Sequence, residues 1–198
     1  MLTSLTWLAT LALLQSAPAS SDPASDNASD AVGPQDSAVP AVECRSEAHR
    51  AFDFWIGDWD VVATGTDRQV GESRIERLSG GCAIRETWMP TNGPSGTSLS
   101  LLNHRTARWE QLWIGVDGKR VDFAGGLVDA NMVLTGYWDS IGGPGKDALV
   151  RMTFTPNPDG TVRQAGEISQ DHGTRWRPFF DYTYRRKASE PLSKEPEA

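Results

Sequence analysis

The sequence predicts an all-β fold, a single up-and-down antiparallel β-barrel of about ten strands with a short helical lead-in. Three observations predict it. Short runs rich in β-branched and aromatic residues follow one another, tight-turn sequences separate them, and hardly any segment has the period of a helix. A long antiparallel sheet of this kind loses its exposed edges by closing on itself.

The strand runs lie at residues Asp58–Ala63, Glu72–Leu78, Cys82–Met89, Thr97–Leu102, Trp109–Val116, Arg120–Val128, Met132–Trp138, Ala148–Thr155, Val162–Ser169 and Arg175–Arg185. The turns between them include Ser79-Gly80-Gly81, Asp117-Gly118 and Pro158-Asp159-Gly160. The one helical segment that we expect is a turn or two within Ser46–Trp55.

The two ends of the chain differ in composition from this region. Residues 1–19 contain a short apolar run followed by small residues, which predicts a signal peptide cleaved near Ala19 and an exported protein. The run is shorter than the about twenty apolar residues that span a bilayer, so we expect no transmembrane segment in the mature chain. Residues 20–43 and 188–198 are poor in large apolar residues, which predicts a disordered acidic linker and a disordered tail around a barrel domain at 44–187.

The charge of the chain follows the same division. The net charge is −7, yet residues 44–187 contain eighteen basic and eighteen acidic residues. The acidic surplus therefore belongs to the two ends. A neutral barrel without a basic stripe argues against nucleic acid as a partner.

Cys44 and Cys82 are the two cysteines of the chain. In an oxidising compartment an even number of cysteines predicts a disulfide, which here would join the lead-in to the strand that Cys82 opens. Closing that loop stabilises a fold by about 4 kcal/mol on the chain-entropy model. The alternative is two buried free thiols.

The segment FDFWIGDWDV at residues 52–61 resembles the start of lipocalins and of the wider calycin superfamily, in which Gly-x-Trp opens the first strand. The resemblance implies that Trp59 plugs the closed end of the barrel. It also implies that Arg185 or Arg186, near the end of the last strand, covers the plug as a cation–π partner.

One subgroup, an uncharacterised family of exported bacterial calycin-like proteins, is similar over nearly all of 44–187. Its members share the opening segment, a Gly-Cys strand start as at Gly81-Cys82, an aromatic strand as in WEQLW at 109–113 and a late turn as in SQDHG at 169–173. The resemblance implies a fold and a periplasmic or extracellular location, and it implies no activity.

Candidate chemical motifs are few. The histidines, at positions 49, 104 and 172, lie in the lead-in and in turns, and no pair of His or Cys residues has metal-ligand spacing, so we expect neither a metal nor another cofactor. Asp171 lies in a segment that resembles the Asp-box of sialidases, which favours a structural turn over a catalytic aspartate.

Strands that line a barrel alternate between inward and outward side chains. The hypothesis for a ligand site is that polar and tryptophan side chains line the lumen together, namely Glu86, Trp88, Trp109, Gln111, Trp113, Arg151 and Gln164. The alternative is that the charged members face water and the tryptophans simply fill the core.

These residues lead to three functional hypotheses. The first is a non-enzymatic carrier or sensor of a small, mostly apolar molecule such as a fatty acid, an isoprenoid or a pigment. The second is a lyase or isomerase in which a buried Glu86–Arg151 pair transfers protons. The third is a filled barrel that acts as an envelope interaction module. An open cavity favours the carrier, and a cavity that contains a carboxylate with a displaced pKa favours the enzyme. A packed interior with an exposed apolar patch favours the interaction module.

Overall fold

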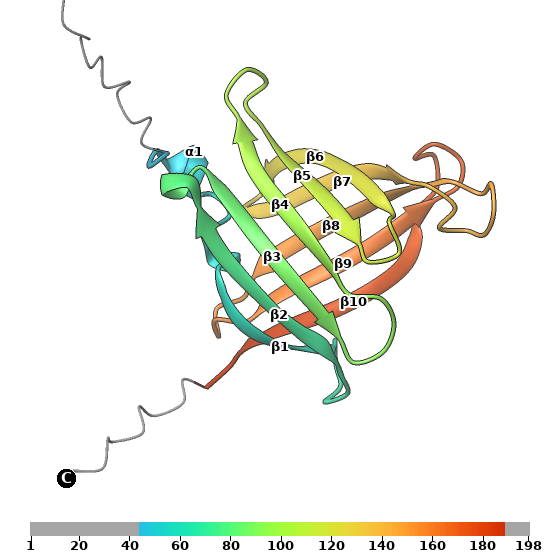
Figure 1. Ribbon diagram of the computed structural model, residues 1–198, viewed down its shortest axis with the longest axis horizontal. Helices are drawn as coiled ribbons and strands as arrows, with labels where there is room; N and C mark the ends of the chain where they lie inside the picture. The colour runs from blue at the N-terminus through green and yellow to red at the C-terminus, as the bar shows by residue number, and fades with distance from the viewer. Residues whose placement is uncertain (1–43, 189–198) are drawn as a thin grey trace, which may run out of the picture. The chain divides into compact units, whose positions relative to one another are not determined.

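Ten antiparallel strands close on themselves in the computed structural model, which describes residues 44–188 (Figure 1). The strands are β1 (Gly57–Ala63), β2 (Gln69–Leu78), β3 (Ala83–Pro90), β4 (Gly96–Asn103), β5 (Arg108–Gly115), β6 (Arg120–Val128), β7 (Asn131–Trp138), β8 (Ala148–Pro156), β9 (Val162–Ser169) and β10 (Arg177–Arg186). The predicted signal peptide and acidic linker, and almost all of the predicted tail, lie outside the described residues.

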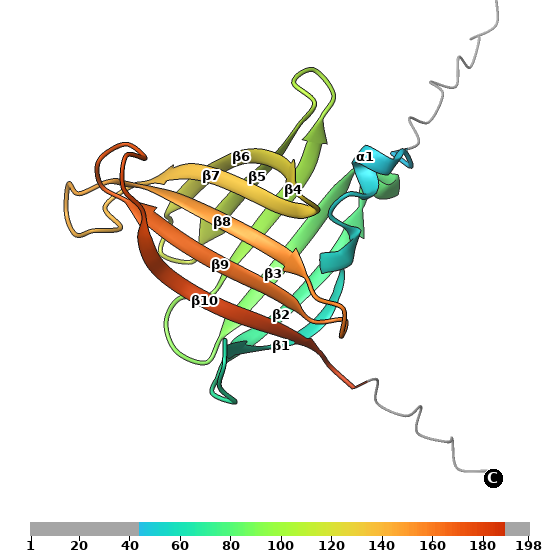
Figure 2. The same cartoon turned by 180° about the vertical axis from the view of Figure 1, so that it is seen from behind.

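Each strand pairs with its neighbours in sequence, and β1 closes the barrel by pairing with β10. The predicted all-β, up-and-down barrel is confirmed. The helical lead-in is confirmed as well: α1 (Glu47–Arg50) is followed by the short 3₁₀ helix η1 (Asp53–Trp55), beside one end of the barrel (Figure 2). None of the helices within residues 44–188 is long and apolar enough to cross a membrane.

The barrel has one closed end and one open end. The lead-in lies at the closed end, where β1 begins and β10 ends. Because the strands alternate in direction, the loops β1–β2, β3–β4, β5–β6, β7–β8 and β9–β10 all lie at the opposite, open end.

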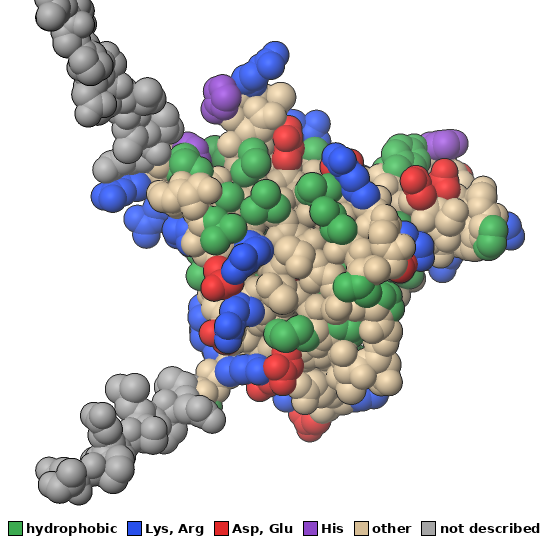
Figure 3. All heavy atoms as spheres, in the orientation of Figure 1, with side chains coloured by type: hydrophobic (Ala, Val, Ile, Leu, Met, Phe, Trp, Pro, Cys, Tyr) green, Lys and Arg blue, Asp and Glu red, His purple; other side chains and the backbone are tan. Residues whose placement is uncertain are grey.

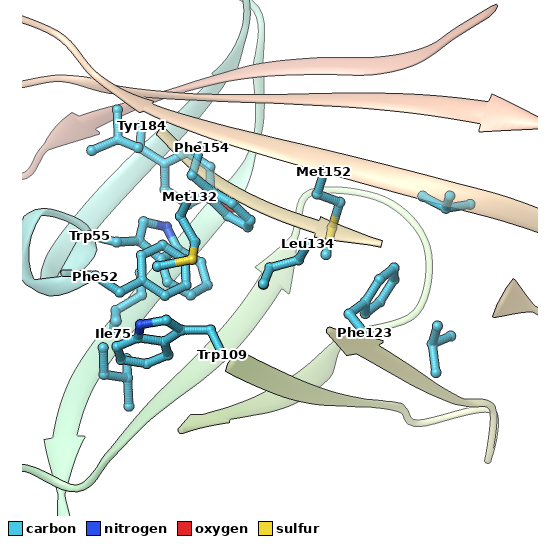
Figure 4. Packing of buried hydrophobic residues seen from close by; sticks show 14 of the residues in the cluster. Phe52, Trp55, Ile75, Trp109, Phe123, Met132, Leu134, Met152, Phe154 and Tyr184 are labelled. Atoms are coloured by element: carbon cyan, nitrogen blue, oxygen red, sulfur yellow. The ribbon is translucent and has the colours of Figure 1, made fainter. Parts of the chain in front are cut away.

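Aromatic side chains fill the closed half of the barrel (Figure 4). Phe52 and Trp55 stack at 4.9 Å between ring centroids, and Phe52 also meets Trp109 and Phe154 edge to face. Trp59 is fully buried, and its indole N–H donates to the Trp55 carbonyl at 2.9 Å. Trp59 therefore belongs to a packed plug, together with the lead-in.

Arg186 covers this plug, with its guanidinium carbon 4.4 Å from the centroid of the Trp59 ring. It is the cross-strand partner of Trp59, which explains why it and not its neighbour reaches the indole. Arg185, the other arginine that the resemblance offers for this role, does not take it, since it forms an ion pair with Asp67. Gly57 completes the arrangement: its φ is +147°, and a Cβ there would lie 2.6 Å from the Arg186 Nη1. The Gly-x-Trp opening thus has a steric reason.

The predicted disulfide is present between Cys44 and Cys82, whose Cα atoms are 4.9 Å apart. Cys82 immediately precedes β3, so the bridge fastens the start of the lead-in to the barrel wall at the closed end. The lead-in is thereby held where Phe52 and Trp55 enter the core.

The outer surface of the barrel is mixed. Figure 3 shows charged side chains beside β1–β3 and apolar side chains scattered over β4 and β5. The charged ones form exposed ion pairs such as Arg74–Asp58 and Arg85–Glu76, which contribute little to stability. Leu99 and Ile114 are the exposed large apolar residues of β4 and β5.

Candidate ligand-binding site

The open half of the barrel contains a cavity of about 210 Å³, which we call the cup. This is the volume that about seven water molecules occupy in the liquid. The cup is lined by Glu86, Trp88, Gln111, Trp113, Phe123, Trp138, Met152, Gln164, Phe179, Phe180, Tyr182 and Tyr184. Its lining is mostly aromatic with a few polar groups, which is the usual composition of a ligand site.

Strand alternation arranges these residues in layers. On β3, Glu86 lies deeper in the barrel and Trp88 lies nearer the open end. On β5, Trp109 packs in the plug, Gln111 comes next, and Trp113 reaches the cup. Polar side chains thus form the floor of the cup, and aromatic rings form its wall.

Small residues on neighbouring strands make room for the rings. A Cβ added at Gly71 would lie 2.8 Å from the Trp88 indole. Gly96 faces Trp113 and Gly166 faces Phe180 in the same way, and in each case a Cβ would meet the ring. Glycine inside a strand often marks such a close approach. The aromatic wall therefore depends on glycines in the strands beside it.

Glu86 is the acidic residue of the floor and is only 6% exposed. Its Oε1 accepts a hydrogen bond from the Ser73 hydroxyl and its Oε2 accepts one from the Ser98 hydroxyl, both at 3.0 Å. Burial raises the pKa of Glu86 from 4.5 to about 7, and these hydrogen bonds oppose the rise. Glu86 therefore changes charge near neutral pH.

The rest of the floor is a hydrogen-bonded set. The Tyr184 hydroxyl donates to Gln164 Oε1 at 2.7 Å and also lies beside Glu86. A hydroxyl carries one hydrogen, so it serves one of these acceptors at a time. Burial, and then the nearby Glu86 charge, raise the pKa of Tyr184 above its ordinary range. Gln111 donates to Ser100 at 3.0 Å.

The charges of the cup are one-sided. No Lys, Arg or His is among the described residues that line it. Likewise, no group of three or more His, Cys, Asp or Glu within residues 44–188 is placed to hold a metal ion. The indole N–H groups of Trp138 and, in the plug, of Trp55 are buried and donate to no described residue.

Six of the seven predicted lumen residues point inward, and Arg151 does not. Trp109 is one of the six, but it belongs to the plug. Arg151 lies on the outer face of β8, donates to Glu167 Oε2 at 2.7 and 2.9 Å, and stacks over Trp176 at 4.2 Å. The reason is alternation: Val150 and Met152 are buried, so Arg151 between them faces outward. The proposed Glu86–Arg151 pair is therefore wrong.

Several residues of the candidate site escaped the sequence-based prediction. Ser73 and Ser98, which hold Glu86, were not predicted, nor were Trp138, Phe180, Tyr182 and Tyr184 in the cup. On β10 an alternating aromatic pattern at 180, 182 and 184 is the signal that could have found three of them. On β4 the apolar residues Leu99 and Leu101 alternate with inward serines, which inverts the usual pattern.

Asp171 lies in the turn between β9 and β10 and is not among the residues that line the cup. Its Oδ1 accepts hydrogen bonds from the Ser169 hydroxyl and the Arg175 backbone N–H, both at 2.8 Å, and its Oδ2 accepts one from Arg175 Nε. The Arg175 hydrogen bonds hold the pKa of Asp171 below its ordinary range. These contacts are those of a residue that fixes a turn.

Comparison with known proteins adds a negative finding. No protein-family model matches the chain, and no curated protein matches it. The closed ten-stranded barrel is compatible with a calycin-like fold.

Proposed function

We propose that this is an exported, lipocalin-like protein that binds one small, mostly apolar molecule in the cup. The observation that carries the proposal is the contrast between the two halves of the barrel. The closed half is filled by Phe52, Trp55 and Trp59, whereas the open half leaves about 210 Å³ between aromatic rings. The interior of a small barrel is either filled by side chains or wide enough for one small ligand. In this barrel the closed half is filled and the open half leaves room for a ligand.

Three further features support the proposal. The half-buried tryptophans Trp88, Trp113 and Trp138 present apolar surface to the cup. The Cys44–Cys82 disulfide suits an oxidising compartment, as does the predicted signal peptide. The resemblance of residues 52–61 to lipocalin openings agrees with a Trp59 plug beneath a guanidinium.

Native mass spectrometry of the protein purified from its own host tests the proposal. We expect a fraction of the protein to carry a small-molecule adduct that is released on denaturation. Met152→Trp adds bulk inside the cup and is expected to lose the adduct, whereas Thr153→Trp places the same ring on the outer face of β8 and is expected to keep it. Circular dichroism checks that both variants fold. An adduct retained equally by both variants would place the ligand elsewhere, and no adduct in the wild type would refute the carrier.

One observation favours proton-transfer catalysis as a second function. The pKa of Glu86, about 7, is the value at which a general acid or base works best at neutral pH. Both of its oxygens already accept serine hydrogen bonds, and no basic side chain among the described cup residues completes an acid–base pair, which favours binding. Conversion of the released ligand over time by the wild type, lost in Glu86→Gln, would instead establish the enzyme.

A further inference from the structure

We propose that the ligand of the cup is a cation, a compound with one ring and an ammonium group that pairs with Glu86 while the ring lies among the aromatic side chains of the wall. This inference rests on the proposed function and names the chemical class that the cup selects. It is carried by the position of Glu86, the absence of a counter-ion in the described cup lining, and the composition of the wall.

The floor holds an acidic group that has no cationic partner among the described residues lining the cup. A carboxylate buried away from water is destabilised unless a charge or several hydrogen bonds compensate it. Glu86 has hydrogen-bond donors placed for the ionised form, because Ser73 and Ser98 each donate to a different oxygen. A carboxylate offers about four acceptor positions, so even with Tyr184 donating as well, one remains for a ligand. An ammonium group fills that position and supplies the missing charge.

The wall suits the same ligand. Aromatic rings pack favourably on one another, and Trp88, Trp113 and Trp138 come from three different strands around the cup, so the ligand's ring would meet other rings on several sides. On one side Tyr182 stacks with Phe180 at 5.0 Å and with Trp88 at 6.2 Å. Rings around the cup and an acid at its floor fit a ligand that has a ring at one end and an ammonium group at the other.

The same features disfavour an anionic ligand. A carboxylate-bearing molecule such as a fatty acid would place its charge in a cup whose described lining contains one acid and no base. The volume of about 210 Å³ is also small for a long chain or a pigment, since ligand pockets for drug-sized molecules run from about 300 Å³ upward. Of the ligands suggested by the sequence, the fatty acid and the pigment are thereby set aside.

The pH dependence of binding follows from the groups that face Glu86. They are Ser73 from β2, Ser98 from β4 and Tyr184 from β10, with Tyr182 as the other titratable side chain in the cup. Burial raises the pKa of both tyrosines, so neither loses a proton near neutral pH. Ammonium binding is therefore expected to strengthen as Glu86 ionises and the pH rises through about 7.

Three probes that differ only in their polar end test the proposal: phenethylamine, phenethyl alcohol and phenylacetate. Binding to the full-length protein is measured by tryptophan fluorescence and calorimetry at about pH 8, where Glu86 is ionised and an alkylammonium, which titrates near about 10, is still charged. We expect the amine to bind roughly tenfold more tightly than the alcohol, as a charged hydrogen bond implies, and phenylacetate to bind most weakly. Glu86→Gln should remove the amine's advantage and leave the affinity for the alcohol within about twofold. Glu167→Gln removes a carboxylate from the outer face and should change neither the advantage of the amine nor the affinity for the alcohol.

The outcomes separate the two proposals. If the alcohol binds as tightly as the amine, or phenylacetate binds best, the cup binds ligands but the cation is refuted. An amine affinity that survives Glu86→Gln also refutes it. If none of the three probes binds while Glu86→Gln and the wild type are both folded, the proposed cationic ligand is refuted. Native mass spectrometry then tests the carrier proposal separately: an adduct on the wild type would support it, and no adduct would refute it as well.

Discussion

Replacing Glu86 with Gln should make the free protein more stable at neutral and alkaline pH. Burial raises the pKa of Glu86 from 4.5 to about 7 in the folded state, whereas in the unfolded chain the solvated side chain keeps its ordinary value. Between these values the folded state binds a proton that the unfolded state has released. The free energy of unfolding of the wild type therefore falls as the pH rises through this window.

The magnitude follows from the two pKa values. The separation between 4.5 and about 7 corresponds to about 3 kcal/mol, which is fully present below about pH 4.5 and lost above about pH 7. A glutamine has the same shape and no charge to bury. Its oxygen accepts from one serine, and its amide donates to the other. Relative to the wild type, Glu86→Gln should therefore gain up to about 3 kcal/mol between about pH 4.5 and about pH 8.

Urea unfolding followed by tryptophan fluorescence, repeated across this pH range, measures the difference. Glu167→Gln serves as the control, because it removes a carboxylate of the same type from the outer face, where Arg151 pairs with it. A difference between Glu86→Gln and the wild type that stays flat with pH, or that favours the wild type at about pH 8, would refute the buried carboxylate.

Three further predictions concern the closed end of the barrel. Cys82→Ser should lower the free energy of unfolding by about 4 kcal/mol in urea titrations, since it opens a loop of 38 residues. A wild-type protein whose Tm is the same with and without reductant would contradict this. Gly57→Ala should destabilise the folded protein by about 1–3 kcal/mol, because Gly57 has a φ of +147° and the added Cβ would contact Arg186. An unchanged unfolding midpoint would count against that geometry. Arg186→Gln should lower the free energy of unfolding by about 1 kcal/mol and alter the fluorescence of Trp59. Arg185→Gln should lower it by no more than a few tenths of a kcal/mol and leave that fluorescence unchanged. Equal effects of the two substitutions would argue against the cation–π contact.

The strands of this protein are predictable because their local chemistry agrees with the fold. Alternating β-branched and aromatic runs bounded by glycine turns locate the barrel strands to within a few residues. The resemblance of the Gly-x-Trp opening to lipocalins predicts the plug, and the structure adds a steric reason, since Gly57 leaves room for Arg186 over Trp59. An even pair of cysteines predicts the disulfide.

The floor of the cup is harder to predict, because it depends on which way each strand faces. Arg151 could have been placed correctly from its apolar neighbours, which alternate on the inner face of β8. The inward serines of β4 could not, because Leu99 and Leu101 on the outer face give that strand the opposite polarity to the one expected.

The mouth of the cup depends on an irregularity of β10. The register of β10 against β9 shifts between Pro178 and Phe180, which brings Phe179 and Phe180 to the cup together. Bulges of this kind re-aim side chains beside functional sites, and strict alternation along a strand does not foresee them. The identity of the lining residues is therefore a property of the closed barrel as a whole.

The most direct test of the buried acid and its ligand is a ¹³C NMR titration of the Glu86 carboxyl, assigned with Glu86→Gln, in the absence and presence of phenethylamine. We expect Glu86 to titrate near pH 7 in the free protein, and to titrate at a lower pH when the amine is bound, because the bound cation stabilises the ionised carboxylate. A titration near the ordinary carboxyl value in both samples would show that Glu86 is not buried in the floor of a cup, and a midpoint that phenethylamine leaves unmoved would show that no cation pairs with it.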